Sequence, residues 1–356
     1  MNYSLNIFKQ LSIPIFLFLS LLLVCAPRFD RNDFGPVKYF VGEGFTEDGL
    51  PFDAYQYITY TKYFRGDLSA QKKLENPFTY RPVAPFIASF LPFKPMTSIN
   101  VLNVLALLVA IVFLNQLLKF LKFKSSFRLL GLILFIYSFP TFYYGSSGNI
   151  DSVLICCLMI GLYTLLKKLW ILLLIIIIIS TGVKETSIVI VFVSIVYILF
   201  KTSIQVSRKI TLIVSCIVVY SSVTIILRKL FGTGSEYIWL PEIQAILENI
   251  SRPKTWLSFI LTLGIPGFMS FFHLKHLKKY YHQTSIKLIL LFGFAISILL
   301  FVLSIISAYA DGRFIWVSYP FTIPLSLYII MELQVRGKKY RSFQKFGFDR
   351  LKNNKK

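Results

Sequence analysis

Long apolar segments alternate with short polar ones along most of the chain. Examples that carry no charged residue are LSIPIFLFLSLLLVCA (11–26), LWILLLIIIIIS (169–180) and LILLFGFAISILLFVLSIIS (288–307). A helix needs about 20 apolar residues to cross a hydrocarbon core of about 30 Å. Helices also satisfy their own backbone hydrogen bonds where no water is available. The pattern therefore predicts an all-α polytopic membrane protein.

The apolar segments accommodate about ten transmembrane helices. We place them at 11–26, 97–118, 129–144, 152–166, 169–181, 187–200, 210–227, 255–272, 286–307 and 314–331. The stretch 152–181 is divided because Lys167 and Lys168 interrupt it, although each half is short for a full crossing. The first segment has no small-x-small cleavage site before Pro27, which favours a retained helix over a cleaved signal peptide.

The distribution of charge supports this division. With a cytoplasmic N-terminus, most of the 38 Lys and Arg residues lie on the cytoplasmic side, and all 16 acids except Glu332 and Asp349 lie outside. This is the positive-inside pattern. A single helix over 152–181 would turn the basic loop 275–287 outward. We therefore expect both termini to be cytoplasmic, with residues 1–335 forming one transmembrane domain and 336–356 a basic tail.

Composition excludes several classes of protein. A content of 56% hydrophobic residues cannot be arranged as a soluble globule. The formal net charge of +22 lies mostly in cytoplasmic loops and the tail, where it attracts anionic membrane lipids. Nucleic-acid binding would need a basic domain with base-reading elements, so it is not expected. The four cysteines lie in apolar segments and show neither disulfide nor zinc spacing. The histidines are expected on a solvated cytoplasmic surface, without a metal: His273, His276 and His282.

The external segments are unequal in length. Residues 27–96 form the longest and 228–254 the second. Long ordered loops usually carry function. Within the first loop, AYQYITYTKYF (54–64) is predicted to form an amphipathic helix on the membrane surface, capped by Asp53, with Tyr57, Ile58, Thr61 and Phe64 near one face. The segment PVAPFIASFLPF (82–93) is too short to span and is predicted to be re-entrant or interfacial.

These features resemble the GT-C glycosyltransferases, a superfamily that includes mannosyltransferase-like membrane enzymes. The resemblance begins with one helix followed by a large external loop, which contains a D-x-Y-x-Y element and a later Gly-Asp. It continues with a helical bundle that contains a G-N-x-D element and, near its end, an arginine before a proline-containing helix. The matching pieces are FDAYQYITYTKYFRGD, YRPVAPFIASFLP, SSGNIDSVLI, STGVKETSIVIV and DGRFIWVSYPFTIPL. The resemblance implies a GT-C-like fold and transfer of a sugar from a polyprenyl-phosphate-linked donor to a hydroxyl of a glycan, lipid or protein.

Such a transfer needs a carboxylate base for the acceptor hydroxyl and cations for the phosphate leaving group, all just above the bilayer. Asp53, Asp48 and Glu47 are the candidate catalytic carboxylates. The candidate substrate-binding residues, some of them cations for the phosphate and others tyrosine faces for a sugar ring, are Tyr55, Tyr57, Arg81, Asp151, Lys184, Glu185 and Arg313. From topology alone we expect these helix ends to converge on the external face. No nucleotide or metal is required by this inverting single displacement, although Asp48 and Asp151 could hold a divalent ion.

Each candidate also has a structural interpretation. Asp53 and Asp151 can act only as helix caps, and Glu47 with Asp48 forms an ordinary turn signature. Arg81 can reach lipid headgroups. Lys184 can simply pair with the neighbouring Glu185, and Asp311 with Arg313.

Two other classes of protein remain as alternatives. A polysaccharide polymerase or ligase has similar chemistry but usually carries its large loop late in the chain. A transporter or flippase of lipid-linked sugars should show paired broken helices and internal repeats, which the sequence does not show. The Ile, Lys, Asn and Phe bias suggests a bacterial cytoplasmic membrane.

Overall fold

The structure, a computed structural model, describes residues 15–29, 52–201, 203–232, 240–276, 286–307 and 309–335. Within these ranges the protein is all-α and contains no strand. The candidate carboxylates Glu47 and Asp48 lie outside the described residues.

Four helical segments are long and apolar enough to cross a membrane, which indicates an integral membrane protein: α6 (Pro95–Phe120), α12 (Val206–Phe231), Pro253–Leu274 and α16 (Ile286–Ser307). The span Pro253–Leu274 contains α14 (Pro253–Ser270). Shorter helices fill the rest of the bundle: Ile15–Cys25, α7 (Ser125–Ile136), α8 (Phe139–Tyr144), α9 (Asp151–Leu166), α10 (Trp170–Val183), α11 (Ile188–Phe200), α13 (Ile243–Ser251), α17 (Arg313–Trp316) and 319–335. Short 3-10 helices connect some of them: η1 (Ala26–Arg28), η2 (Phe78–Tyr80), η3 (Glu185–Ser187) and η4 (Phe271–His276).

Three of the predicted spans are not single regular helices. The segment 129–144 divides into α7 and α8, because Ser138 caps a new helix whose first turn contains Pro140. The segment 255–272 covers most of α14 and the start of η4, and α14 is broken at Gly264, two residues before Pro266. The segment 314–331 is interrupted by a turn between α17 and the helix 319–335. Sequence hydropathy located these segments but not the local breaks.

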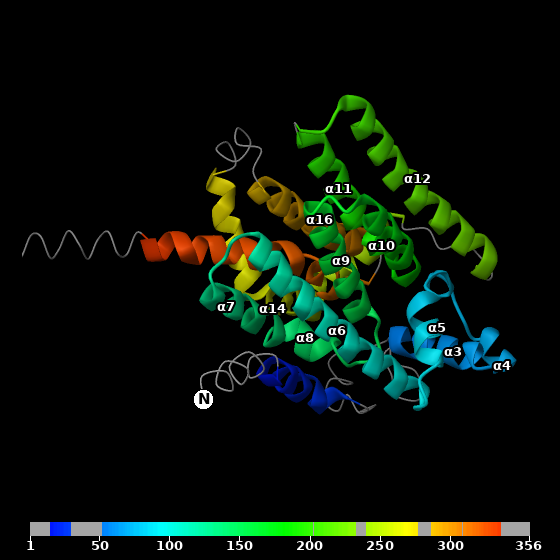
Figure 1. The fold of residues 1–356 in the computed structure, drawn as a ribbon. Coiled ribbons are helices and arrows are strands. Elements are labelled where there is room, and N and C mark those ends of the chain that lie inside the picture. The colour runs from blue at the N-terminus through cyan, green and yellow to red at the C-terminus, as the bar shows by residue number, and fades with distance from the viewer. Residues whose placement is uncertain are drawn as a thin grey trace, which may run out of the picture.

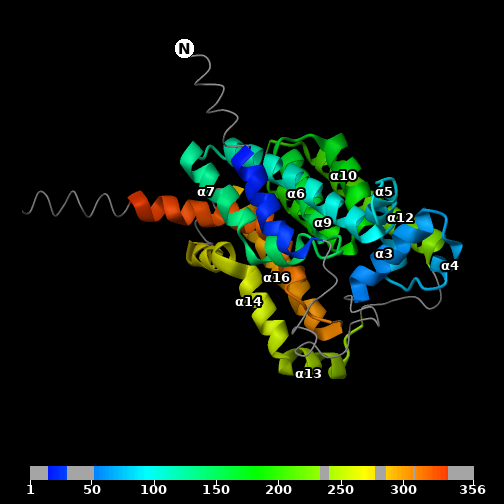
Figure 2. The same cartoon turned by 90° about the horizontal axis from the view of Figure 1, so that it is seen from below.

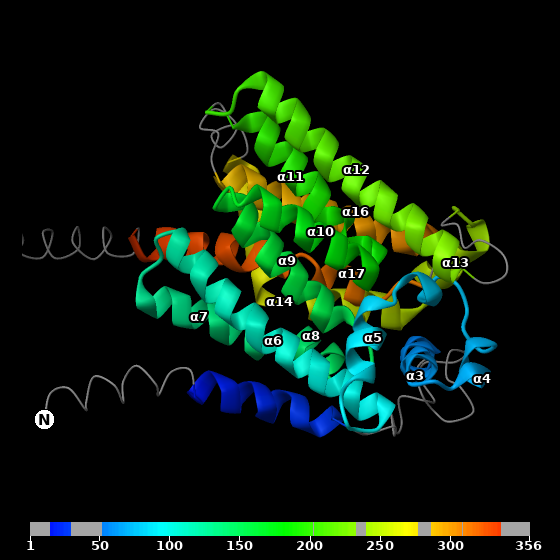
Figure 3. The ribbon, with the colours of Figure 1, turned by 45° about the vertical axis from the view of Figure 1, so that its right-hand side comes forward.

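The helices form a bundle in which α9 lies against α6 and α10 (Figure 1). Every residue of α9 is buried except Ile160 and Tyr163, so this helix occupies the core. In contrast, Cys216 is the one buried residue of α12, which lies along the outside of α10 and α11 (Figure 3). An apolar helix with a single buried side chain fits a lipid-facing position.

Residues 52–93, part of the loop predicted to be external, form a compact cap on one end of the bundle, built from α3 (Phe52–Phe64), α4 (Leu68–Gln71) and α5 (Val83–Ser89) (Figure 2). The Arg65 guanidinium holds these pieces together by donating to backbone carbonyls and one hydroxyl in the 88–98 segment: Ala88, Ser89, Leu91, Phe93 and Ser98. The segment 82–93 contains α5, whose seven residues are too few to cross a membrane, as predicted.

Two expectations about the loop are wrong in detail. The helix of the loop begins at Phe52, so Asp53 lies in its first turn and is not its cap. It also buries almost every residue between Ala54 and Thr61, so it is packed on more than one face rather than lying amphipathically on a surface. The residue that caps a helix here is Asp67, whose carboxylate accepts from the backbone N–H of Ser69.

The expectation of a solvated His273 is also wrong. This side chain is fully buried, and its Nε2 lies 2.8 Å from the carbonyl oxygen of Leu325. It tethers the end of α14 and η4 to the helix 319–335, a packing role that its place in a basic segment of the sequence did not indicate.

Candidate active site

Seven charged side chains from widely separated parts of the sequence meet beneath the cap. They are named here the charged cluster: Asp53, Arg81, Asp151, Lys184, Glu185, Asp311 and Arg313. They come from α3, the end of η2, the start of α9, the junction of α10 with η3, and the start of α17. Four carboxylates thus face three cations at one end of the bundle.

Arg313 is the centre of the charged cluster. Its Nη1 donates to Asp53 Oδ2 at 2.6 Å and to Asn149 Oδ1 at 3.2 Å. The same nitrogen lies 3.9 Å from Asp151 Oδ2, and Nε lies 3.7 Å from Asp311 Oδ2 without a hydrogen-bond partner. The side chain is 12% exposed and that of Asp53 is 26% exposed, so the pair is accessible from the cap side.

Lys184 and Asp151 form the most deeply buried ion pair of this group. Lys184 Nζ donates to Asp151 Oδ1 at 2.6 Å, and the two side chains are 6% and 4% exposed. The second carboxylate oxygen of Asp151 has no hydrogen-bond partner. A buried ion pair is stabilising only when its remaining polar atoms are satisfied, so this unsatisfied oxygen is unusual for a purely structural pair.

Arg81 links the loop to the end of α10. Its Nε donates to Glu185 Oε2 at 2.9 Å, and its Nη1 donates to the Tyr57 hydroxyl at 2.8 Å. Tyr220 of α12 donates to the Glu185 carbonyl. Lys184 therefore pairs with Asp151 and not with its neighbour Glu185, which removes the interpretation of Lys184 and Glu185 as a local pair.

A tight turn before α9 brings Asp151 under α3. Gly148 has φ of +76°, a conformation that favours glycine. Its backbone N–H donates to Asn100 Oδ1 at 2.8 Å, and Asn103 donates to the Asn149 carbonyl at 2.5 Å. Both asparagines belong to α6, so the core of the bundle fixes the turn that presents Asn149 and Asp151.

We expect Gly148→Ala to separate the cap from this turn. A Cβ at Gly148 would lie 3.0 Å from the Cβ of Ala54 in α3, whereas a Cβ at Gly66, whose φ is +96°, would meet nothing within 4 Å. Both substitutions incur the cost of a left-handed conformation, about 1 to 2 kcal/mol. Gly148→Ala adds overpacking of about 1 to 3 kcal/mol. Thermal unfolding of purified protein should show a lower midpoint for Gly148→Ala than for Gly66→Ala; equal midpoints would contradict the close packing.

The backbone around Arg313 is held equally closely. A Cβ at Gly312 would lie 2.4 Å from the Ser258 carbonyl oxygen, so only glycine allows the chain to approach α14 here. The Gly312 N–H donates to the Ser258 hydroxyl at 3.0 Å. Tyr144, at the end of α8, donates a hydrogen bond to Asp311. These contacts place Arg313 at the start of α17, directed at the carboxylates.

The charges determine the ionisation of the cluster. Burial acts to raise the pKa of Asp53, but the nearby positive charges of Arg313, Lys184 and Arg81 outweigh it and hold this pKa below its ordinary value. Burial lowers the pKa of Lys184, and the Asp151 carboxylate offsets part of this effect. Burial also disfavours the charged form of Arg313, but the Asp53, Asp151 and Asp311 carboxylates raise its pKa overall. Asp53 is consequently a carboxylate, and Arg313 a cation, at neutral pH.

The structure brings together all but one of the sequence candidates that it describes: Asp53, Tyr57, Arg81, Asp151, Lys184, Glu185 and Arg313. The exception is Tyr55, which is half-buried against the hydrophobic core and makes no polar contact with the cluster. Among the described residues, no group of three His, Cys, Asp or Glu side chains is arranged to hold a metal ion.

Sequence reasoning missed the supporting residues Asn100, Asn103 and Tyr144. The two asparagines had a signal, because they are polar, three residues apart and therefore on one face of an otherwise apolar helix. Polar side chains inside a membrane helix are costly and usually face a functional or structural partner. Tyr144 had no comparable signal, since tyrosine is common at membrane boundaries.

Comparison of the chain with protein-family models, curated proteins and solved structures gave no match.

Proposed function

We propose that the protein is an integral membrane glycosyltransferase of GT-C type that moves a sugar from a polyprenyl-phosphate-linked donor to a hydroxyl acceptor at the charged cluster. The observation that carries the proposal is the convergence of Asp53 with Arg313, Lys184 and Arg81 from distant segments at one accessible end of a helical bundle. A carboxylate beside several cations offers both the base and the phosphate-binding charge that the reaction needs.

The reaction is a single displacement with inversion. The Asp53 carboxylate accepts the proton of the acceptor hydroxyl while the acceptor oxygen forms a bond to the anomeric carbon. The bond between that carbon and the phosphate oxygen breaks, and its electron pair leaves with the polyprenyl phosphate. Arg313 and Lys184 stabilise the negative charge that develops on the leaving group. Tyr57 is buried, and its hydroxyl accepts a hydrogen bond from Arg81, so it positions this cation rather than contacting the sugar.

The pair between Asp53 and Arg313 gives the proposed mechanism a way to activate the base. A carboxylate with a lowered pKa is ionised but weakly basic. A donor phosphate that binds Arg313 competes with Asp53 for the guanidinium, and the loss of this partner raises the pKa of Asp53. Donor binding therefore makes Asp53 a stronger base when the acceptor arrives. The active site lies outside the cytoplasm in this proposal, with both chain ends in the cytoplasm of a bacterial cell.

One observation favours the alternative of a transporter or flippase. The helix α14 is broken at Gly264, where φ is +52°, and broken helices line the substrate sites of many transporters. However, the Thr262 carbonyl before the break accepts a hydrogen bond from the Tyr319 hydroxyl at 2.9 Å. The break is thus closed by a neighbouring helix, and the charged cluster lies at helix ends rather than at mid-bundle.

The proposal is tested by measuring donor turnover by the full chain in proteoliposomes. The donors are a panel of radiolabelled polyprenyl-phosphate sugars, with nucleotide sugars for comparison, and a membrane extract supplies the acceptor. We expect release of polyprenyl phosphate from one donor and an acceptor product with inverted anomeric configuration. Movement of intact lipid-linked sugar across the membrane without cleavage would support the transport alternative instead.

A further inference from the structure

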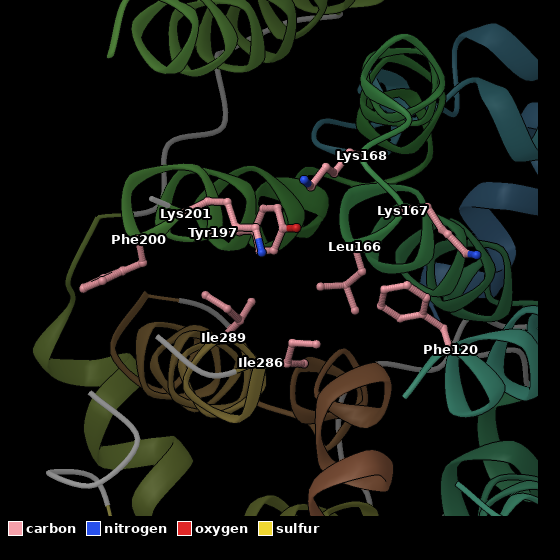
Figure 4. A pocket seen from close by; sticks show the side chains of 9 residues that line it. All are labelled: Phe120, Leu166, Lys167, Lys168, Tyr197, Phe200, Lys201, Ile286 and Ile289. Atoms are coloured by element: carbon pink, nitrogen blue, oxygen red, sulfur yellow. The ribbon is translucent and has the colours of Figure 1, made fainter. Parts of the chain in front are cut away.

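A second polar feature lies at the opposite end of the helices. It is a cavity of about 290 Å³ where α6, α9, α11 and α16 end or begin (Figure 4). The helix α9 begins with Asp151 in the charged cluster and ends at Leu166 in the cavity wall. Its 16 residues correspond to a length of roughly 24 Å, so the cavity and the charged cluster are separate sites.

The wall of the cavity is mostly apolar and its rim is basic. The wall residues are Phe120, Leu166, Tyr197, Phe200, Ile286 and Ile289, and the rim residues are Lys167, Lys168 and Lys201. Lys167 and Lys168 are exposed and Lys201 is half-buried, whereas Leu166, Tyr197 and Ile289 are buried. Figure 4 shows Lys168 and Lys201 near Tyr197 on one side of the cavity, and Lys167 beside Phe120 on the other.

The lysines of the rim have no carboxylate partner in the part of the chain that the structure describes. Lys167 lies over the rings of Phe120 and Tyr163, at 5.1 and 5.9 Å from the centroids, and Lys201 over that of Tyr197 at 5.9 Å. Among the described residues, the acid at this end of the bundle is Glu332, which pairs with Lys287. Three cations therefore surround an apolar hollow with no described counter-ion, which makes the site complementary to an anion that carries an apolar group.

We propose that this cavity binds an anionic glycerophospholipid, with the headgroup phosphate between Lys168 and Lys201 and the start of an acyl chain along Phe200, Ile286 and Ile289. The volume is near the lower limit of ligand pockets, roughly 300 to 1,000 Å³, and suits a headgroup and chain origin rather than a whole lipid. Because the site lies at the membrane boundary predicted to be cytoplasmic, the rest of the lipid can remain in the adjacent leaflet. The proposal does not depend on sugar transfer at the other end.

The test measures lipid binding to the full chain in neutral detergent micelles, by native mass spectrometry and by the thermal shift on titration. The probes are phosphatidylglycerol, phosphatidylcholine and inorganic phosphate. Basic residues near an anionic lipid contribute about 1 kcal/mol each, which corresponds to about a fivefold change in affinity. We expect Lys168→Gln/Lys201→Gln to weaken phosphatidylglycerol binding about 25-fold. The wild-type protein should bind phosphatidylglycerol more tightly than phosphatidylcholine.

The matched control is Lys119→Gln/Lys124→Gln, which removes two exposed lysines at the same end that do not line the cavity. This variant should bind phosphatidylglycerol nearly as wild type does. Equal weakening in both variants would show that overall surface charge attracts the lipid, and the proposal would fail. The proposal would also fail if inorganic phosphate reproduced the full thermal shift, since the site would then bind a small anion. It would fail as well if neither variant lost affinity for phosphatidylglycerol.

Discussion

Asparagine in place of Asp53 will lower kcat for sugar transfer by about 10²- to 10⁴-fold, the usual contribution of a positioned base. The amide keeps the shape of the side chain and can still accept the hydrogen bond from Arg313, but it cannot take up the acceptor proton. Arg313 also keeps its contacts with Asn149, Asp151 and Asp311. We therefore expect a folded protein with a lower donor KM, because the neutral amide competes less strongly than the carboxylate with the donor phosphate for Arg313. Both constants are measured as initial rates on the donor identified in the panel.

The control for this substitution is Asp67→Asn. Asp67 is an exposed carboxylate of the same loop, and asparagine preserves its role as the cap of α4. This variant should transfer sugar at the wild-type rate. Full activity in Asp53→Asn would contradict the assignment of the base, and attention would move to Glu47, Asp48 or Asp311.

The second large effect concerns the buried pair of Asp151 and Lys184. Asp151→Asn or Lys184→Met alone leaves one charge buried without its partner, and each should lower the free energy of unfolding by about 3 to 5 kcal/mol. The double variant removes both charges and should recover much of that loss, since a neutral buried pair is tolerated. Thermal or denaturant unfolding of the three variants beside wild type measures the coupling.

Activity in the double variant separates a structural from a functional role for this pair. Without Lys184 the leaving group loses one of its cations, and we expect transfer to remain about 10²- to 10³-fold below wild type although stability is regained. If activity returned together with stability, the pair would serve folding alone and Arg313 and Arg81 would be the cations that matter.

The helical class of the fold followed from the sequence because hydrophobic segments this long have few alternatives. The positions of breaks did not follow, since they depend on local chemistry within apolar segments. Ser138 and Pro140 start a new helix inside one predicted span, and Gly264 interrupts another. Hydropathy averages over such residues, whereas capping and backbone conformation are decided by single positions.

The candidate site was predictable to the extent that charges in a mostly apolar chain are rare and gather at helix ends. Arg81, Asp151, Lys184 and Arg313 all stand out in this way. Their pairing was not predictable, because Lys184 pairs with Asp151 at the start of the neighbouring helix α9 in preference to the adjacent Glu185. The role of Asp53 as the partner of Arg313 depends on how the cap packs on the bundle, through the contact of Ala54 with the Gly148 turn, which no local pattern encodes.

The most direct test of the central claim uses the leaving group common to all candidate donors. A polyprenyl phosphate with a photoreactive group beside the phosphate is cross-linked to the full chain in proteoliposomes, and the labelled peptides are mapped. The proposed mechanism predicts labelling in α3 and in residues 309–318, and this labelling should be reduced by unlabelled polyprenyl phosphate and by Arg313→Gln. Labelling confined to the cavity bordered by Lys167, Lys168 and Lys201, with none at the charged cluster, would contradict it.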